Sequence, residues 1–511
     1  MGAALRLPTE LRDFLALPGP QSLVIRGAPG SGKTTLGLAL LEAADGVRIL
    51  VTNRVSAAEL AREFPWLSDA ELAKLKIVDA SEWDGQDPAI SHVVGSTAAV
   101  LDADQRERRE LHEFLTLPTA IQSAWSQLPA DSPSTVVVDS WDALIERTMG
   151  RMKGTLGPSL PPDREEIERR MLSWMARAPA HLVLVLESEA PTQLDYLVNG
   201  VVANRREVVD DRLERWVDLP KLRGIRIANA SYPFTVEGAK FQCIEPLRPY
   251  TEIHRGRIDS APDHMPGFIW PGSRSFAEAF GRLALGRVTL LEVDDEVPDR
   301  VVQHLLTPPK IHAVSSGGRV LVIPSPSLTP DEIWRPIEEA HPPGRISDLF
   351  RVLDVSGQLE RATHDDPSDR KTGIFSAKLF AKMKPDANPE DNELGRWVSG
   401  GVAGSPPALV TLYDTGVESL AASLNQPIST EITTALTSSV RGSLSQGGLH
   451  MIAVGRPDNP LLRPIRSLST IHLRLRARQG RVLIYGLKPW TTGFVLTESA
   501  GNGPYDLLRI V

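Results

Sequence analysis

The sequence predicts an α/β protein with two domains, each built on a mostly parallel sheet that helices cover on both faces. Three observations lead to this fold class. Short apolar runs, such as residues 47–52 and 135–138, alternate with stretches of helical periodicity, such as 57–64 and 164–175, as expected for parallel strands buried on both faces. A glycine-rich segment at 27–34 joins an apolar run to a helix. The 511 residues also exceed what one ordinary core accommodates.

The remaining elements of the first half follow from periodicity and from turn residues. Residues 7–17 have helical spacing and stop at Pro18-Gly19-Pro20. Residues 147–162 are rich in glycine and proline and predict an exposed loop. Residues 201–241 alternate in short runs between turn residues, which predicts antiparallel strands at one sheet edge. In the polar stretch 82–109, Arg106, Arg108 and Arg109 favour a solvated helix, with a basic binding face as the alternative.

The composition limits the class of protein. It is 41% hydrophobic and 23% charged, as in soluble globular proteins, and the net charge of −8 argues against a surface that coats nucleic acid. The single cysteine, Cys243, excludes an internal disulfide and a thiolate metal cluster. No apolar run approaches the ~20 residues that cross a bilayer, and the first six residues lack the features of an export signal. We therefore expect a cytoplasmic protein without a membrane partner.

Residues 27–34 match the phosphate-binding pattern G-x-x-x-x-G-K-[ST] at every fixed position. An apolar run precedes them and a helical run follows, and this order disfavours the alternative of a turn that is glycine-rich by coincidence. Backbone N–H groups of such a loop bind phosphate, the lysine neutralises the β and γ oxygens, and the hydroxyl of the last residue binds Mg²⁺. The predicted phosphate site consists of Gly27, Ala28, Pro29, Gly30, Ser31, Gly32, Lys33, Thr34 and Thr35.

The apolar run 135–138 ends in Asp139-Ser140. An acid at the carboxyl edge of a parallel sheet lies beside a phosphate loop in the same sheet. Asp139 is therefore our candidate ligand, with Thr34, for the metal of a bound nucleotide. The alternative is a helix N-cap, a common role for an aspartate after a strand. Together with the loop, the sequence predicts binding of ATP with Mg²⁺.

These motifs resemble the RecA superfamily of ATPases, specifically its KaiC/RAD55-like branch. The resemblance rests on the phosphate loop, on Asp139-Ser140 and on the segment Leu219-Pro220-Lys221-Leu222-Arg223-Gly224, followed by Tyr232-Pro233-Phe234 and Gly238. It implies RecA-like domains, and it implies that Lys221 and Arg223 lie at a subunit boundary and reach the γ-phosphate of a neighbouring chain. The chain would then form a homo-oligomer, such as a ring. The alternative is a basic edge hairpin with solvated side chains.

Within that branch, the amino-terminal region is similar to the archaeal gas-vesicle regulator family GvpD. The similar segments are Leu11-Arg12-Asp13-Phe14, residues 22–27, Asn53-Arg54-Val55-Ser56, and residues 63–67. This resemblance implies a nucleotide-dependent regulatory protein that acts by contact with a transcription activator, and not a metabolic enzyme.

One position departs from the RecA-like pattern. Such ATPases usually have a glutamate just after the second strand as general base, whereas this chain has Asn53 and Arg54 there. Neither side chain accepts a proton at neutral pH. Asp142 and Glu187 are the candidate substitutes. We expect slow or partner-dependent hydrolysis.

The second half repeats the pattern of the first with a period of about 265 residues. We predict a RecA-like P-loop domain at 1–245, a linker at 246–274, and a degenerate RecA-like domain at 275–511. Residues 286–291, 318–323 and 408–414 correspond to the strands of the first half, the last one to the strand of Asp139. Where a phosphate loop would lie, residues 292–296 contain four acids and no lysine or glycine, which repels phosphate. An unrelated α/β domain is the alternative.

Three functions fit these observations. The first is a nucleotide-dependent regulatory switch, the second a DNA recombination and repair ATPase, and the third a scaffold in which ATP serves only folding. The negative net charge gives little support to the second, so nucleic acid is a secondary alternative as partner. Asp365, Asp366 and Asp369 lie in a charged stretch with proline, for which solvated loops are a simpler reading than a metal cluster.

Overall fold

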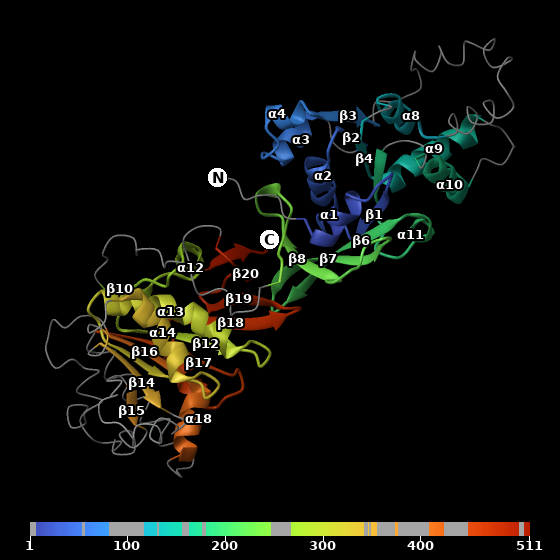
Figure 1. The fold of residues 1–511 in the computed structure, drawn as a ribbon. Helices are drawn as coiled ribbons and strands as arrows, with labels where there is room; N and C mark the ends of the chain where they lie inside the picture. Colours follow the sequence, from blue (N-terminus) through green and yellow to red (C-terminus); the bar gives the residue numbers. More distant parts are fainter. Residues whose placement is uncertain are drawn as a thin grey trace. The chain divides into compact units, whose positions relative to one another are not determined.

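The computed structural model describes residues 7–53, 57–80, 117–129, 132–155, 163–175, 180–246, 267–341, 346, 349–354, 374–376, 408–423, 448–499 and 505–511. The chain divides into two compact units (Figure 1). Unit 1 comprises Met1–Glu245 with Ile510–Val511, and unit 2 comprises Pro246–Arg509. The predicted basic stretch around Arg106 and the acidic stretch around Asp365 lie outside the described residues.

Unit 1 contains one nine-stranded sheet in the order β3-β2-β4-β5-β1-β6-β7-β8-β9. The strands from β3 to β6 in this order are parallel, and β7, β8 and β9 continue the sheet in antiparallel fashion. The strands are β1 Ser22–Gly27, β2 Val47–Thr52, β3 Leu75–Asp79, β4 Ser134–Asp139, β5 Ala180–Val185, β6 Gly200–Val209, β7 Arg212–Leu222, β8 Ser231–Thr235 and β9 Gln242–Cys243.

Helices cover both faces of this sheet. The helices are α1 Thr9–Leu15, α2 Lys33–Ala43, α3 Ala57–Glu63, α4 Asp69–Leu72, α8 Thr119–Ser126, α9 Trp141–Thr155, α10 Arg164–Met175, α11 Leu194–Leu197 and the 3₁₀ turn Glu237–Ala239. Alternate residues of a strand point to opposite faces. Accordingly, Val137 packs in the core beneath α2, whereas its neighbours Val136 and Val138 pack in the core beneath α8, α9 and α10. The central strands are apolar at almost every position because each strand fills two cores.

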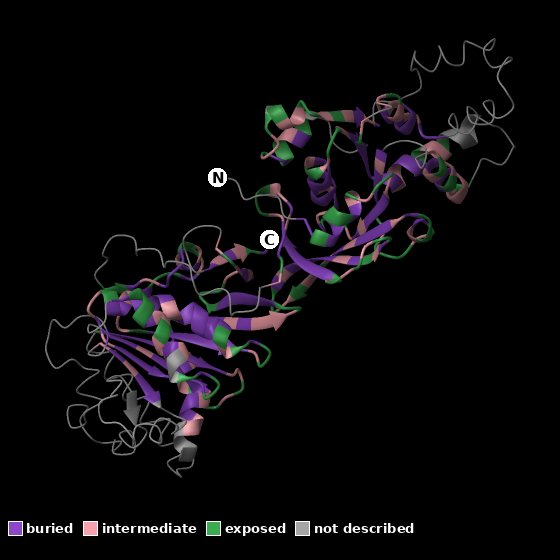
Figure 2. Ribbon diagram, in the orientation of Figure 1, coloured by how far each residue is buried: buried purple, intermediate pink, exposed green. Residues whose placement is uncertain are grey.

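Unit 2 has a ten-stranded sheet in the order β15-β14-β13-β16-β17-β12-β18-β19-β20-β21 and a small sheet of β10 and β11. Its strands are β10 Phe268–Ile269, β11 Leu283–Ala284, β12 Arg287–Val293, β13 Val320–Ile323, β14 Phe350–Asp354, β15 Ile374–Ser376, β16 Ala408–Tyr413, β17 Leu449–Gly455, β18 Ile471–Arg478, β19 Arg481–Lys488, β20 Phe494–Thr497 and β21 Asp506–Arg509. Its helices are α12 Arg274–Phe280, α13 Asp299–Ser315, α14 Pro330–Ala340, α18 Asp414–Ser423 and α20 Leu462–Leu468. Buried residues again lie on both sides of the central strands (Figure 2).

The two large sheets have the same topology. When β15 at the edge is set aside, each strand of unit 2 occupies the place that its counterpart holds in unit 1, with β12 in the place of β1 and β16 in the place of β4. In each sheet the antiparallel part begins at the corresponding strand, because β18 pairs antiparallel with β19 as β6 does with β7. The predicted fold class, α/β with two mostly parallel sheets covered by helices, is confirmed. A shared strand order of this complexity favours duplication over an unrelated second domain.

One prediction of local structure is wrong. The predicted loop at 147–162 begins inside α9, which continues to Thr155. Buried Trp141, Leu144 and Ile145 recur at helical spacing and attach the start of this helix to the sheet, and this outweighs the later glycines. Within the predicted linker 246–274, residues 268–269 form β10, and α12 begins at Arg274.

The helix α13 of unit 2 contains a fully buried lysine, Lys310, whose ammonium donates to Gln303 Oε1 at 2.7 Å. Burial lowers the pKa of Lys310 from 10.5 to about 7. Between these two pH values, Lys310 binds a proton in the unfolded chain but not in the folded chain. Stability should therefore rise with pH from about 7 towards 10. Between pH 7 and 9 we expect a gain of up to about 2 kcal/mol, measured by urea unfolding of unit 2. In Lys310→Met this slope should disappear, whereas an equal slope in both proteins would refute the role of this lysine.

Candidate nucleotide-binding site

The segment 27–34 forms the turn from β1 to α2, as the motif predicts. Gly32 precedes the helix with φ 86°, a left-handed conformation that favours glycine. A side chain at Gly27 would place its Cβ 2.2 Å from the carbonyl oxygen of Asn204 on β6, so only glycine fits. The first N–H groups of α2 have no acceptor within the helix and provide a site for an anion.

Lys33 lies at the centre of this loop and is 9% exposed. Its Nζ donates to the carbonyl oxygens of Gly27 at 2.6 Å and of Ala28 at 2.8 Å. The ammonium is therefore bound to the loop that it would share with a phosphate chain, and a phosphate oxygen would compete with these carbonyls for its protons.

Thr34 and Asp139 lie together, as the sequence predicts. The hydroxyl of Thr34, at the start of α2, donates to Asp139 Oδ2 at 2.6 Å, and Asp139 is the last residue of β4 with 6% of its surface exposed. A hydroxyl and a carboxylate oxygen are ligands that suit Mg²⁺, which usually takes one or two protein ligands and completes its shell with phosphate oxygens and water. No group of three or more His, Cys, Asp or Glu side chains suited to a metal occurs in the described part of the chain. The pair thus fits a metal that enters with a nucleotide.

The position of the usual general base has a structural role here. Asn53 follows β2, and its Oδ1 accepts from the backbone N–H of Ser140 at 3.2 Å. Its own N–H donates to the carbonyl of Asp139 at 3.3 Å. Asn53 therefore fixes the end of β4. Arg54 lies outside the described residues.

The two candidate substitutes differ in their surroundings. Both oxygens of Asp142 are engaged, Oδ1 by Arg164 at 2.6 Å and Oδ2 by the backbone N–H of Glu187 at 2.6 Å. Glu187 follows β5, is exposed, and accepts from the hydroxyl of Ser140 at 2.8 Å. Ser140 is adjacent to Asp139, so this hydrogen bond links Glu187 to the end of β4 that carries the predicted metal ligand. Asp142 instead positions the backbone of Glu187.

The predicted trans-acting cations lie at the far end of β7. Lys221 Nζ donates to the carbonyls of Asp195 at 2.6 Å and Tyr196 at 3.3 Å, and Arg223 donates to Tyr196 at 3.2 Å. Burial and the charge of Arg223 lower the pKa of Lys221, against the opposite effect of Asp195. Tyr196 is 77% exposed. The two cations thus share one edge with an exposed aromatic ring, and in the described part of the chain their hydrogen bonds go to that edge and not to the phosphate loop of their own unit.

Sequence reasoning missed two arginines beside the phosphate loop. Arg206 on β6 and Arg215 on β7 are direct cross-strand partners. Arg215 Nη1 donates to the carbonyl of Gly30 at 2.6 Å, and Arg206 Nη1 lies 3.3 Å from where a Cβ on Gly30 would be. The Nε of Arg215 donates to the main-chain oxygen of Val511 at 2.6 Å. Burial and the charge of Arg206 lower the pKa of Arg215. Only the strand register could have revealed this pair.

The strand register of unit 2 identifies the residue that holds the place of Asp139. Asp139 is paired with Val185 on β5, and its counterpart, opposite Val454 on β17, is Tyr413. Tyr413 is also buried on the face of the sheet covered by α13, as Asp139 is on the face covered by α2. A phenol in this position removes the carboxylate that a metal would need.

The acids of unit 2 also differ from their predicted placement. Glu292 is still part of β12, so only the later residues occupy the place of the loop. There Asp294 contacts Arg474 of β18 at 2.7 Å and Arg476 at 3.6 Å. Glu292 itself is 5% exposed and lies 2.5 Å from Arg466, 3.0 Å from His472 and 3.5 Å from Arg474. These acids are neutralised by arginines of the same unit.

One feature of the trans-acting edge recurs in unit 2. Lys221 and Lys488 hold the same position in the register of their hairpins. Lys221 donates to the carbonyl of Asp195 in α11, and Lys488 donates to that of Arg466 in α20 at 2.8 Å. In its described residues, unit 2 therefore lacks the predicted metal and phosphate ligands of unit 1 but retains this lysine.

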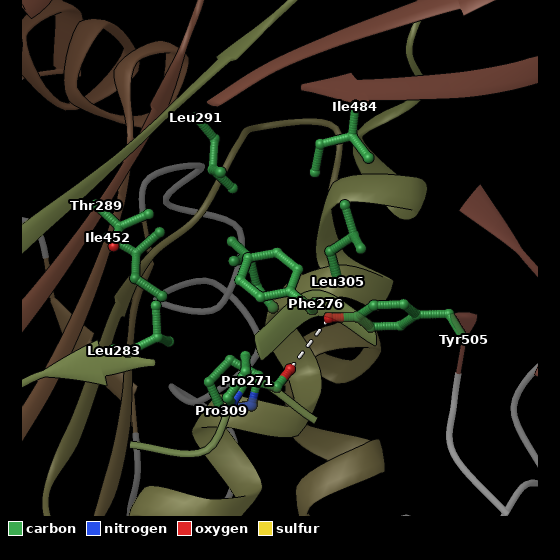
Figure 3. A pocket seen from close by; sticks show the side chains of 11 residues that line it. Pro271, Phe276, Leu283, Thr289, Leu291, Leu305, Pro309, Ile452, Ile484 and Tyr505 are labelled. Atoms are coloured by element: carbon green, nitrogen blue, oxygen red, sulfur yellow. Dashed lines mark hydrogen bonds between the residues drawn. The ribbon is translucent and has the colours of Figure 1, made fainter. Parts of the chain in front are cut away.

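A small cavity with a mostly apolar lining lies in unit 2 (Figure 3). Its lining is Pro271, Phe276, Leu283, Thr289, Leu291, Leu305, Leu306, Pro309, Ile452, Ile484 and Tyr505. The hydroxyl of Tyr505 donates to the carbonyl of Pro271, and Thr289 contacts the buried His450. Because the polar groups of the lining have partners within the protein, the cavity offers a ligand only apolar contacts.

No described helix has the length and apolarity required to span a bilayer.

The comparisons agree with these observations. Residues 11–220 match the family model "GvpD gas vesicle protein, P-loop domain". The chain is 31% identical over 245 residues to protein GvpD1 and 30% identical over 246 residues to protein GvpD2, both of Halobacterium salinarum. These alignments cover 47% of this chain and 41% and 44% of the two relatives, so the chain spans less than half the length of the relatives that it matches. A P-loop domain implies nucleotide binding, generally with Mg²⁺. Residues 11–220 are thus similar to the P-loop domain of the GvpD gas vesicle proteins.

Proposed function

We propose that this chain is an ATP-binding regulatory protein of gas-vesicle formation, a switch whose unit 1 binds ATP with Mg²⁺ and whose nucleotide state determines contact with a protein partner. The observation that carries the proposal is the pairing of Thr34 with Asp139 at 2.6 Å, beside a loop that contains Lys33. These are the groups that a magnesium nucleotide requires. The names of the two relatives and of the family model support the link to gas vesicles.

A switch needs two states with different contacts. Lys33 bonded to Gly27 and Ala28 represents one arrangement of the loop. A triphosphate would draw the ammonium away from these carbonyls and would order the loop around the phosphates. We propose that this change is transmitted to a transcription activator in the cytoplasm. We further propose a homo-oligomer, such as a ring, in which Lys221 and Arg223 approach the nucleotide of a neighbouring chain.

Hydrolysis should be slow, and the surroundings of the two acids predict which one supports it. Glu187→Gln should lower ATP turnover by about tenfold or more, because it removes the exposed carboxylate beside Asp139. Asp142→Asn should have a smaller effect, since an amide oxygen still accepts from the backbone N–H of Glu187. Phosphate release by the purified protein measures both. The opposite ranking would assign the role to Asp142.

The regulatory role is tested in cells that carry a reporter under a gas-vesicle promoter together with its activator. Expression of this chain should change the reporter signal, and Lys33→Ala should abolish the change. Lys74→Ala is the matched control, because Lys74 is an exposed lysine of unit 1, distant in sequence from the loop. Equal reporter levels with and without the wild-type chain would contradict the regulatory role, even if the protein binds ATP.

A further inference from the structure

We infer that Arg206 and Arg215 form a second anion-binding element of the nucleotide site and contact its α-phosphate. This inference rests on the proposed binding of ATP to unit 1. It assigns a role to two residues outside the glycine-rich motif, and it predicts which part of the nucleotide they recognise.

The first argument is their place on the sheet. Asn204, on β6, donates from its Nδ2 to the carbonyl of Ser31 at 3.3 Å, so its face of the hairpin is the one against the phosphate loop. Arg206 is two residues further along β6 and shares that face, and Arg215 lies directly opposite on β7. Both guanidinium groups approach Gly30, as described above.

The second argument is charge. Two like charges directly opposite each other in a sheet are unfavourable. Within the described part of the chain, no carboxylate pairs with Arg206. The adjacent Arg205 points to the other face, where Asp218 and Glu207 lie within 3.0 Å of it. The chain therefore neutralises the arginine that faces away from the loop and leaves an excess of positive charge on the face towards it. An anion between Arg206 and Arg215 would offset their repulsion.

The third argument is the strand order. The metal ligand Asp139 is on β4, on one side of β1, whereas β6 and β7 lie on the other side. Asp139 and Thr34 would hold a magnesium ion, which would neutralise the terminal part of the triphosphate on the β4 side of β1. The remaining phosphate, which carries the nucleoside, would then extend towards β6. The α-phosphate is the one that all adenine nucleotides share.

The test measures affinities of the full chain for ATP, ADP and inorganic pyrophosphate with Mg²⁺ by calorimetry. Arg206→Gln should weaken ATP and ADP equally, by about fivefold, because the side chain is exposed and the lost contact is charge-assisted. Pyrophosphate, which occupies the β and γ positions, should bind as it does to the wild type. Arg205→Gln is the matched control, since it removes the same charge from the opposite face, and it should leave all three affinities within twofold.

Charge reversal separates a binding role from a structural one. In Arg206→Glu, the new carboxylate would pair with Arg215, so the ligand-free protein should unfold at an equal or higher temperature. Its affinity for ATP and ADP should nevertheless fall by more than tenfold. Affinities within twofold of wild type in both Arg206 variants would overturn the inference and leave the proposed function intact. An equal loss for pyrophosphate would overturn the assignment to the α-phosphate. If the wild type binds no nucleotide, the proposed function itself fails.

Discussion

Replacing Lys33 with alanine should raise the Kd for magnesium ATP by about 100-fold or more, which corresponds to about 3 kcal/mol. The reason is that this ammonium is the cation at the centre of the loop, bonded to Gly27 and Ala28 at 2.6 and 2.8 Å, where it would meet two phosphate oxygens. The backbone N–H groups and the pair of Thr34 and Asp139 would remain but could not replace its charge. Calorimetric titration of the purified chain measures this loss.

Folding must be separated from binding in this experiment. Lys33 donates to two loop carbonyls, so its removal could disturb the loop as well as the ligand. Lys33→Met retains the apolar part of the side chain and should lose affinity to the same extent as Lys33→Ala. The far-UV circular dichroism of both variants should equal that of the wild type. Retention of wild-type affinity by both would show that the phosphate site lies elsewhere.

The second large effect is on stability. Glu292→Gln should lower the free energy of unfolding of unit 2 by about 2–3 kcal/mol. The carboxylate is 5% exposed and lies among Arg466, His472 and Arg474. Its replacement by an amide removes the negative charge that these three side chains contact. The partial exposure of the two arginines keeps the expected loss below that for a fully buried pair. Urea unfolding measures the difference.

The same variant has a characteristic pH dependence. Burial alone would raise the pKa of Glu292, but hydrogen bonds and charges of His472 and Arg466 lower it below its usual 4.5. A depressed carboxylate pKa stabilises the fold above pH 4.5, and this stabilisation is lost as the pH falls through the folded value. The wild type should therefore approach the stability of the variant in acid. Glu296→Gln, which removes an exposed acid four positions away, should change little at any pH.

The parts of the site that are local in sequence could be predicted from it. The loop 27–34 is determined by glycines and a lysine at fixed spacing, and Asp139 is recognised because an acid at the end of an apolar strand lies at the carboxyl edge of the sheet. The central strands were recognisable because they fill two cores and are apolar at nearly every position. Pattern alone therefore located the fold class and the residues around the predicted metal.

The parts that depend on register could not be predicted. Arg206 and Arg215 meet only because the β6–β7 hairpin pairs them, and one residue of slip would direct them to the other face. The same limit applies to unit 2, where only the register shows that Tyr413 holds the place of Asp139. At α9 the glycines suggested a loop, whereas the buried apolar stripe that begins at Trp141 favoured the helix.

The ion pairs of Asp294 with Arg474 and Arg476 affect how many nucleotides one chain can bind. Arginines offset the acids at that loop and Tyr413 stands in place of a metal ligand, so among the described residues only unit 1 has the groups that a nucleotide needs. We therefore expect titration to saturate at one equivalent per chain. A single binding site cannot produce a sigmoidal binding isotherm by itself. Any Hill coefficient above unity would therefore report coupling between separate polypeptides.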